Sequence, residues 1–378
     1  MNVAVEYDAI VVGGGPAGSS CATILAQAGM KTLVLEKAAF PRPKICGDCI
    51  HPKAWPLFDR LGVSEKFRQN SHRVIRRLSV TNQGGKSVSV DLQENNERPF
   101  FSMQRSEFDD ILLRHAADRG TEVLTRHEMI GVKRDSDVWE IEVRNNSNST
   151  ISWFRCRVLI GADGRNSRVG EHFRRLGLVR HSHVRKDRCG VQWHTQYQEA
   201  VADGVEMYLF ALGYAGVVNC SNETATMGMV TSPDIAAIAK RDFPFFLRKT
   251  LHANDKARWR IPLCAPTDNV FTASPIHPRR TLVEGQGARL IGDARQTVEP
   301  FTGHGVLLAL HDGISSGLSI VEERKHPPKK SLIESHFMPN HFFSPVLRKP
   351  SFAESAVSFA SYFPSLVTIL GKVAYSSR

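Results

Sequence analysis

DAIVVGGGPAG, residues 8–18, joins an apolar run typical of a buried strand to a G-x-G-x-x-G motif. Gly13 permits the tight turn that follows such a strand. Gly15 has no Cβ, so a pyrophosphate can approach the backbone there, and Gly18 lets the following helix pack closely on the strand. The stretch therefore predicts a strand–turn–helix unit that binds a dinucleotide.

A helix and an acidic residue follow at the spacing that this unit requires. We expect a helix over residues 19–28, ended by Gly29, whose free N–H groups and positive dipole end favour phosphates. A second apolar run, residues 31–35, leads into Glu36, eighteen residues after Gly18. The Glu36 carboxylate can accept hydrogen bonds from a ribose hydroxyl pair. A glycine-rich turn without a ligand is the weaker reading of this pattern.

Two later strands end in turns that pair Gly with Asp. They are RVLIGADGRNS, residues 157–167, and ARLIGDA, residues 288–294, which is followed by PFTGHG, residues 300–305, and an apolar stretch. Asp293 lies where a strand meets a glycine-rich loop, a place from which its carboxylate can bind a polyol hydroxyl. The N–H groups after the loop begin a helix whose dipole favours an electron-rich group.

These segments resemble the D-G and G-D motifs of the flavoprotein monooxygenases and related reductases, which share the p-hydroxybenzoate hydroxylase fold. The resemblance implies FAD as the cofactor, with the G-D aspartate on its ribityl chain and the helix after the P-x-x-G-x-G loop pointing at the flavin ring. RSEFD, residues 105–109, is similar to the R-x-x-x-D helix start whose arginine reaches FAD in that superfamily. The cofactor-binding residues predicted in this way are Gly13, Gly15, Pro16, Ala17, Gly18, Glu36, Lys37, Arg105, Asp163, Gly292, Asp293, Pro300, Gly303, Gly305 and Val306.

The electron donor stays open. The D-G motif usually ends in an arginine, and this chain has Gly170 at that place. NAD(P)H is one candidate donor, and ferredoxin or a separate flavin reductase are the others.

FPRPKICGDCIHPKAWPLFDRLG, residues 40–62, is similar to a segment of geranylgeranyl-reductase-type flavoproteins, in which a C-G-D/E-G turn precedes a proline-started helix. The Phe301-Thr302 form of the second motif and GYAG, residues 213–216, also look like this branch. The Trp and Phe-Pro that the branch usually carries after this point are missing. The resemblance implies reduction of a carbon–carbon double bond in a hydrophobic, isoprenoid or similar substrate by hydride from reduced flavin.

Such a reduction also needs a proton donor, and the candidate catalytic residues are Cys46, Asp48 and His304. Alternatively, His304 is a loop residue that faces solvent. His51 precedes a proline and is better explained as a helix N-cap. Cys46 and Cys49 form a C-x-x-C for which four readings compete: a zinc site, a redox disulfide, a single Cys46 that touches flavin or substrate, and packing in a tight turn. Zinc is the weakest because no second C-x-x-C exists, so we expect no metal.

Other reactions remain open on the same fold. A monooxygenase would use the reduced flavin with oxygen to hydroxylate a small or carrier-bound substrate. WRIP, residues 259–262, resembles part of a W-x-W-x-I-P stretch of flavin halogenases, but no lysine stands out as the one that those enzymes place between two tunnels. A non-catalytic flavin-binding protein is a third alternative, against which the intact G-D loop argues.

Composition sets the remaining bounds. The chain has 378 residues, seven of them cysteine, and a net charge of +11 from 49 basic and 38 acidic residues. No secretory opening and no apolar run of about 18 residues is present, so we expect a cytoplasmic protein. The excess of positive charge suits anionic cofactors and, as alternatives, an acidic carrier protein or peripheral attachment to an anionic membrane. Nucleic acid is not expected, because the basic clusters lack interleaved aromatic residues.

We therefore predict an α/β fold in which a Rossmann-like FAD-binding domain is interleaved with a mixed β-sheet substrate domain, followed by a helical C-terminal tail. The crossing pattern comes from the resemblance. The FAD-binding domain is assigned to residues 1–75, 101–170 and 285–320, the substrate domain to 76–100 and 171–284, and the tail to 321–378. Within the tail, the apolar residues 351–374 suit a lid or a membrane-surface helix, or else helices packed on the substrate domain.

Overall fold

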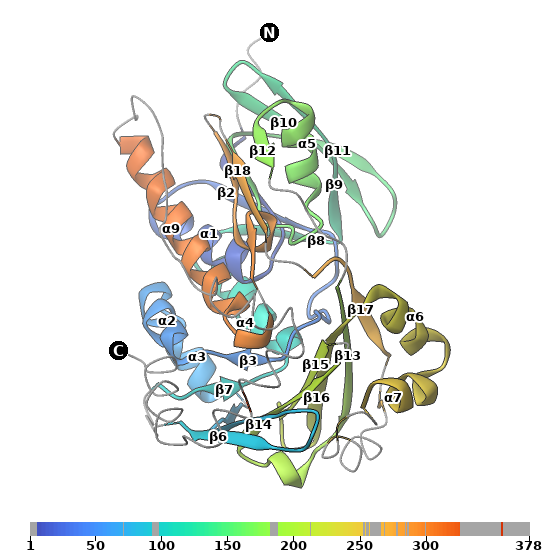
Figure 1. Ribbon diagram of the computed structural model, residues 1–378. Coiled ribbons are helices and arrows are strands. Elements are labelled where there is room, and N and C mark those ends of the chain that lie inside the picture. Colours follow the sequence, from blue (N-terminus) through green and yellow to red (C-terminus); the bar gives the residue numbers. More distant parts are fainter. Residues whose placement is uncertain are drawn as a thin grey trace.

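The chain folds around two seven-stranded sheets that lie in separate layers (Figure 1). The computed structural model describes residues 6–70, 72–92, 98–181, 188–211, 213–251, 269–276, 279–283, 287–298 and 300–325, together with 254, 257, 266, 267, 285 and 357. The predictions for the tail beyond residue 325, Val357 excepted, and for residues 259–262 lie outside this part of the chain.

The first sheet has the strand order β8-β2-β1-β11-β10-β9, with β19 paired to β11. Its central parallel strands β1 and β2 are buried on both faces, as the near-continuous apolar sequence of β1 requires. β9 and β10 extend the sheet in antiparallel fashion. The strands are β1 Tyr7–Val12, β2 Thr32–Glu36, β8 Glu122–Thr125, β9 His127–Asp135, β10 Val138–Asn145, β11 Ile151–Gly161 and β19 Ala288–Leu290.

Three helices pack beside this sheet: α1 Pro16–Gln27, α4 Arg105–Asp118 and α9 Gly305–Lys325 (Figure 1). α1 begins three residues before the predicted start, because Pro16 fits the first turn, where its missing N–H is not needed. α1 and α9 lie unusually close. A Cβ on Gly313 would be 2.2 Å from the carbonyl oxygen of Ala17, so only glycine fits there.

The second sheet has the order β17-β13-β16-β15-β14-β5-β6 and is mixed, since β5 and β14 are parallel. One face is covered by α6 Pro233–Arg241 and α7 Phe243–Leu251, which pack on Trp193 (Figure 1). Because side chains alternate along a strand, residues 192, 216 and 228 lie on the opposite face. The strands are β5 Arg77–Thr81, β6 Ser87–Asp91, β13 Cys189–Gln196, β14 Gly204–Phe210, β15 Gly213–Asn219, β16 Thr224–Thr231 and β17 Phe271–Ala273.

Two three-stranded sheets connect these layers. They are β12 Val179–His181 with β18 Arg279–Val283 and β20 Gln296–Thr297, and β3 Cys49–Ile50 with β7 Phe101–Ser102 and β4 Arg73–Val74. The remaining helices are η1 Pro52–Ala54, α2 Trp55–Leu61, α3 Ser64–Gln69, α5 Arg168–Arg175, η2 Glu199–Val201, η4 Gly292–Ala294 and η5 Pro300–Thr302. The predicted fold class is confirmed: a Rossmann-like α/β layer and a mixed sheet alternate along one chain. None of the described helices is both long enough and apolar enough to span a membrane.

Candidate functional site

The glycine loop after β1 has the geometry that its sequence predicts. Gly13 has a φ of +109°, and a Cβ there would lie 2.4 Å from the carbonyl oxygen of Ala162. A Cβ on Gly18 would lie 1.9 Å from the carbonyl oxygen of Gly13. At Gly15 the only atom near such a Cβ is Nη2 of Arg42, at 3.5 Å. Gly13 and Gly18 therefore serve the packing of strand and helix, whereas Gly15 leaves the backbone open toward a ligand.

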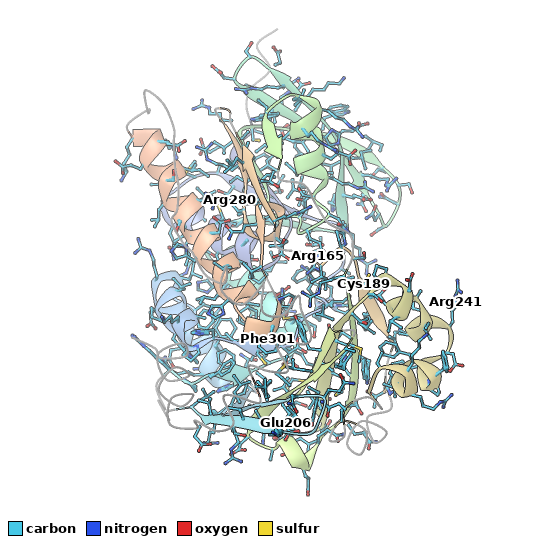
Figure 2. All side chains as sticks on the ribbon, in the orientation of Figure 1. Arg165, Cys189, Glu206, Arg241, Arg280 and Phe301 are labelled. Atoms are coloured by element: carbon cyan, nitrogen blue, oxygen red, sulfur yellow. The ribbon has the colours of Figure 1, made fainter. Side chains whose placement is uncertain are left out.

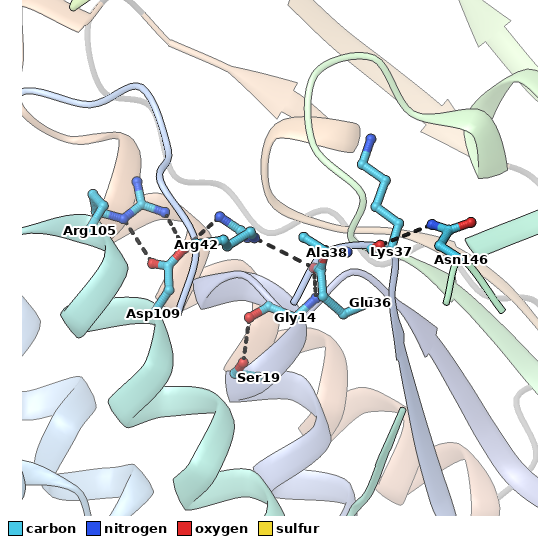
Figure 3. A network of polar contacts seen from close by, with 9 residues as sticks. All are labelled: Gly14, Ser19, Glu36, Lys37, Ala38, Arg42, Arg105, Asp109 and Asn146. Carbon is cyan, nitrogen blue, oxygen red and sulfur yellow. Dashed lines mark hydrogen bonds and ion pairs between the residues drawn. The ribbon is translucent and has the colours of Figure 1, made fainter. Parts of the chain in front are cut away.

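Glu36 lies against this loop at the end of β2 (Figure 3). Its Oε2 accepts a hydrogen bond from the backbone N–H of Gly14, and its Oε1 accepts one from Ala38, both at 2.9 Å. The carboxylate is only 5% exposed. Each oxygen keeps a second lone pair, so the pair of ribose hydroxyls predicted for Glu36 can still bind.

A partly buried cation beside the loop was not anticipated from the sequence. Arg42 lies between two carboxylates, with Nε 3.8 Å from Oε2 of Glu36 and Nη1 3.3 Å from Oδ2 of Asp109 (Figure 3). Asp109 is itself held by Arg105, which donates from Nε at 2.8 Å and from Nη2 at 3.0 Å. Burial lowers the pKa of Arg105, but its interactions, chiefly with the Asp109 carboxylate, raise it by more, so the guanidinium stays charged.

The donors of this network suit an anionic cofactor. Nη1 of Arg42 is buried and makes no hydrogen bond to any described residue. A buried N–H group without a hydrogen bond is costly even inside the ion pair with Asp109, and a pyrophosphate next to Gly15 would supply acceptors for it. The only local signal for Arg42 was a basic residue in the PRPK stretch after β2.

The G-D segment and its loop lie across from the glycine loop. Gly292 has a φ of +58°, and its N–H donates to Oδ2 of Asp312 at 2.8 Å, which fixes the turn after β19. Asp293 forms an ion pair with Arg165 at 3.7 Å. The loop closes at Gly303, whose φ is +67° and whose N–H donates to the carbonyl of Pro300 at 3.1 Å. α9 then begins at Gly305, as predicted, and its first N–H groups have no partner within the helix.

Asp163, the aspartate of the D-G motif, is held by hydrogen bonds from Ser167 and Arg168. Oδ1 of Asp163 accepts from Ser167 Oγ at 2.5 Å, and Oδ2 accepts from the backbone N–H of Arg168 at 2.7 Å. Asp163 thus caps α5 while also lining the cavity described next. Burial raises the pKa of this carboxyl, against the lowering effect of the Ser167 hydrogen bond.

One cavity of about 660 Å³ joins the two layers. Its residues Arg165 and Phe301 lie in the middle of the molecule, between the two large sheets (Figure 2). The cavity is lined at one end by the predicted cofactor residues, among them Gly13, Gly15, Pro16, Ala17, Glu36, Lys37, Arg105, Asp163, Asp293, Pro300, Gly303, Gly305 and Val306. Its other end is lined by the second sheet, mainly by Leu78, Val205, Met207, Gly216, Val218, Thr226 and Gly228.

The Cys46–Cys49 turn lies between the two ends of the cavity. Both thiols are free, and burial raises the pKa of Cys46 although Arg105 opposes it, so Cys46 keeps its proton at neutral pH. Asp48 is 1% exposed and has a φ of +53°, which is unusual for a residue with a side chain. Within the described residues, no group of three or more His, Cys, Asp or Glu side chains is placed to hold a metal ion.

Asp48 connects this turn to the second sheet. Its Oδ1 accepts from the backbone N–H of Arg105 at 3.2 Å, and its Oδ2 accepts from Thr226 Oγ1 at 2.5 Å. Nε2 of His194 lies 3.8 Å from the same Oδ2. Thr226 lines the cavity, so a chain of groups that can carry a proton runs from His194 through Asp48 to the cavity wall. The only sequence signal for His194 was the alternation of apolar and polar residues in the segment that forms β13.

His304, the histidine that the sequence proposes as catalytic, lies outside this chain of groups. The rings of His304 and His51 are 4.7 Å apart, and His304 is not among the residues that line the cavity. His51 accepts a hydrogen bond from the N–H of Lys53 at 3.1 Å, which confirms the predicted N-cap. A catalytic role for His304 stays a prediction.

Comparison with known proteins identifies the family and the fold. A family model described as "FAD binding domain" matches residues 6–335. The chain is 27% identical over 321 residues to a menaquinone reductase of Mycolicibacterium smegmatis, covering 81% of this chain and 74% of the relative. It is 28% identical over 346 residues to a geranylgeranyl diphosphate reductase of Rhodobacter capsulatus, covering 89% and 81%. A flavin-dependent halogenase of Armillaria mellea is 26% identical over 365 residues, covering 82% of this chain.

The chain does not span every relative in full. It covers 64% of that halogenase and 40% of a Methanosarcina barkeri protein that is 33% identical over 168 residues, or 44% of this chain. Among solved structures, a flavoprotein/dehydrogenase from Cytophaga hutchinsonii has a TM-score of 0.74 at 20% identity, covering 86% of this chain and 80% of that one. A myxobacterial chondrochloren halogenase, a FAD-dependent enzyme, has a TM-score of 0.75 at 21% identity, covering 85% and 76%. These two structures share the fold.

Proposed function

The chain belongs to the FAD binding domain family of flavoenzymes and takes FAD as its cofactor, and from this premise we propose that it reduces a carbon–carbon double bond of a hydrophobic substrate. The observation that carries the proposal is that the described cavity reaches from the cofactor residues to an apolar sheet face. When bound and reduced, FAD supplies the hydride for such a reaction.

The protein's own residues would bind the cofactor and deliver the proton. Gly15, Glu36, Arg42 and Asp293 would hold FAD, and the start of α9 would favour negative charge on it. Two cavity-lining groups can give a proton to the substrate: Sγ of Cys46, which stays protonated at neutral pH, and Oγ1 of Thr226. Asp48 and His194 lie behind Thr226, whose hydroxyl donates to Asp48 in this structure; reversal of that hydrogen bond would let a proton from the His194–Asp48 pair pass through the hydroxyl to the cavity.

A halogenating or hydroxylating enzyme is the alternative, because halogenases match the chain about as well as reductases do. The halogenases that WRIP resembles use a lysine between flavin and substrate. The described residues that line the sheet end of the cavity include no lysine, since Lys44 lies beside Asp293 and Gly164. This difference supports the reductase.

The test is a product analysis with FAD-loaded protein. The protein is reduced with dithionite without oxygen and given a set of polyprenyl compounds, and parallel samples receive NAD(P)H, air and halide. Products that gain two hydrogens support the proposal. Products that gain an oxygen or a halogen, only in air, would overturn it. Free FAD without protein is the control for uncatalysed reaction.

Contact with an anionic membrane or an acidic carrier protein remains a prediction from the charge of the chain. Co-sedimentation of the full chain with vesicles that contain phosphatidylglycerol tests the membrane contact. No binding at low salt would contradict it.

A further inference from the structure

Four residues in one cross-strand row form the floor of the cavity on the second sheet. Gln192 of β13 pairs with Gly228 of β16, Gly228 pairs with Gly216 of β15, and Gly216 pairs with Met207 of β14. All four line the cavity. Residues that pair directly lie on the same face of a sheet, so this row crosses the cavity floor from a polar end to an apolar one.

The middle of the row has no side chains. A Cβ on Gly228 would meet nothing within 4 Å, so the space above this residue is open. A Cβ on Gly216 would lie 2.6 Å from Sδ of Met207, so the methionine side chain covers that glycine. Glycine inside a strand often marks a place where a ligand approaches the backbone. Gly228 is therefore a flat, bare site with the Met207 sulfur at one side.

Gln192 supplies the polar end. It is 3% exposed, and its Oε1 accepts a hydrogen bond from the backbone N–H of Cys46 at 2.7 Å. This bond fixes which way the amide points, because only the oxygen can accept. The hydrogen bond to Cys46 uses the oxygen alone, so the NH2 group of Gln192, which lines the cavity, is left to donate to a ligand there.

We propose that this row is a subsite for a planar, conjugated carbonyl group of the substrate, which lies flat on Gly228 with its carbonyl oxygen at Nε2 of Gln192 and its far edge against the sulfur of Met207. The spacing of strands separates Gln192 from Met207 by about 14 Å along the row, enough for a ring between their side chains. Sulfur at the edge of a conjugated ring is a favourable contact. A branched, sp³-rich chain would gain neither contact.

This subsite deepens the proposed function and rests on it. Hydride addition to the β-carbon of a conjugated carbonyl moves the π electrons toward the oxygen, and a proton at the α-carbon completes the saturation. The reduced cofactor is the reductant. A donor fixed at the carbonyl oxygen stabilises the charge that develops there. Gln192 and the Cys46 turn would thus act on the same end of the substrate.

The binding test uses three probes with FAD-loaded protein: duroquinone, durene and farnesol. Duroquinone is a planar ring with carbonyls that does not alkylate thiols, durene is the same shape without them, and farnesol is a branched acyclic chain. Binding is read from the perturbed flavin absorbance. Gln192→Glu keeps the acceptor for Cys46 but loses the donor, so it should weaken duroquinone at least tenfold and leave durene unchanged.

Gly228→Val fills the bare floor. Valine suits a strand, and nothing blocks its Cβ, so the protein should fold and retain FAD while both ring probes weaken at least tenfold and farnesol does not. Gly84→Val, in the exposed turn between β5 and β6, is the control. Wild-type binding of duroquinone by Gly228→Val, or equal weakening of durene and duroquinone by Gln192→Glu, would overturn the subsite.

The two proposals fail differently. Duroquinone that binds as expected, in a protein whose products gain only oxygen or halogen, would overturn the reductase and leave the subsite. A protein that saturates polyprenyl compounds but binds farnesol and neither ring would overturn the subsite and leave the reductase.

Discussion

Replacing Gly313 by alanine tests whether the contact between α1 and α9 sets the geometry of the cofactor site. The new Cβ would lie 2.2 Å from the carbonyl oxygen of Ala17, and this obstacle is backbone, which cannot rotate away. Overpacking of a close-packed interior costs about 1–3 kcal/mol. Alanine is also better than glycine inside a helix by about 1 kcal/mol. Because the obstacle is backbone, we take an overpacking cost of about 2–3 kcal/mol. Subtracting the gain of about 1 kcal/mol in helix propensity leaves an expected loss of about 1–2 kcal/mol in the free energy of unfolding.

The same separation should weaken FAD binding. Ala17 lies in the first turn of α1, where the pyrophosphate would bind, and Gly305 at the start of α9 lines the same cavity, so moving the helices apart moves two parts of one site. A loss of about 1.4 kcal/mol in binding corresponds to a tenfold higher Kd. Stability is measured by urea unfolding of the apo-protein, and FAD binding by titration of flavin fluorescence.

Ser315→Ala on the same helix is the matched control, because it changes helix propensity and adds no atom. Gly313→Ala with unchanged stability and unchanged Kd would refute the reasoning, since the helices would then separate at no cost. Reduced stability with an unchanged Kd would refute only the link between the helix contact and the cofactor site.

Three further predictions concern the cofactor and the proton. Arg42→Gln should raise the Kd for FAD about ten- to hundredfold, measured by calorimetry, because it removes a charged donor beside the glycine loop; an unchanged Kd would argue against a phosphate at Arg42. Thr226→Val should slow substrate reduction about a hundredfold at unchanged FAD affinity, since Asp48 loses its path to the cavity; equal rates would remove Thr226 from proton transfer. Because burial raises the pKa of Cys46 above its ordinary 9.0, its alkylation by iodoacetamide, followed by peptide mass spectrometry, should still be rising above pH 9, and a plateau by pH 8 would contradict this.

The parts of the site that could be predicted are those whose chemistry is local. Gly13, Gly18 and Glu36 lie within one strand–turn–helix–strand unit, where a few residues of spacing determine both the backbone and its ligand. The helix starts at Arg105 and Gly305 were predictable for the same reason, since each follows a short motif.

The remainder depends on contacts between distant segments. Gln192, Gly228 and Met207 come from three strands, and only the register of the second sheet places them in one row. Arg42 becomes a buried donor because α4 brings Asp109 against the glycine loop. A motif also does not say where a side chain points. Both oxygens of Asp163 accept hydrogen bonds at the start of α5, which the D-G pattern alone could not indicate.

The order in which the first sheet is assembled has a consequence for synthesis of the protein. β1 ends at Val12, but β19, which completes the parallel part of the sheet beside β11, ends only at Leu290, and α9 follows it. At about 5–20 residues per second, a ribosome needs roughly 15–55 seconds to bridge that interval. For the last 129 residues of that interval, roughly 6–26 seconds, the nascent chain already contains β11 but lacks β19 to cover its edge, and the flavin pocket cannot form. The order of the elements along the chain therefore places completion of the flavin pocket after synthesis of α9.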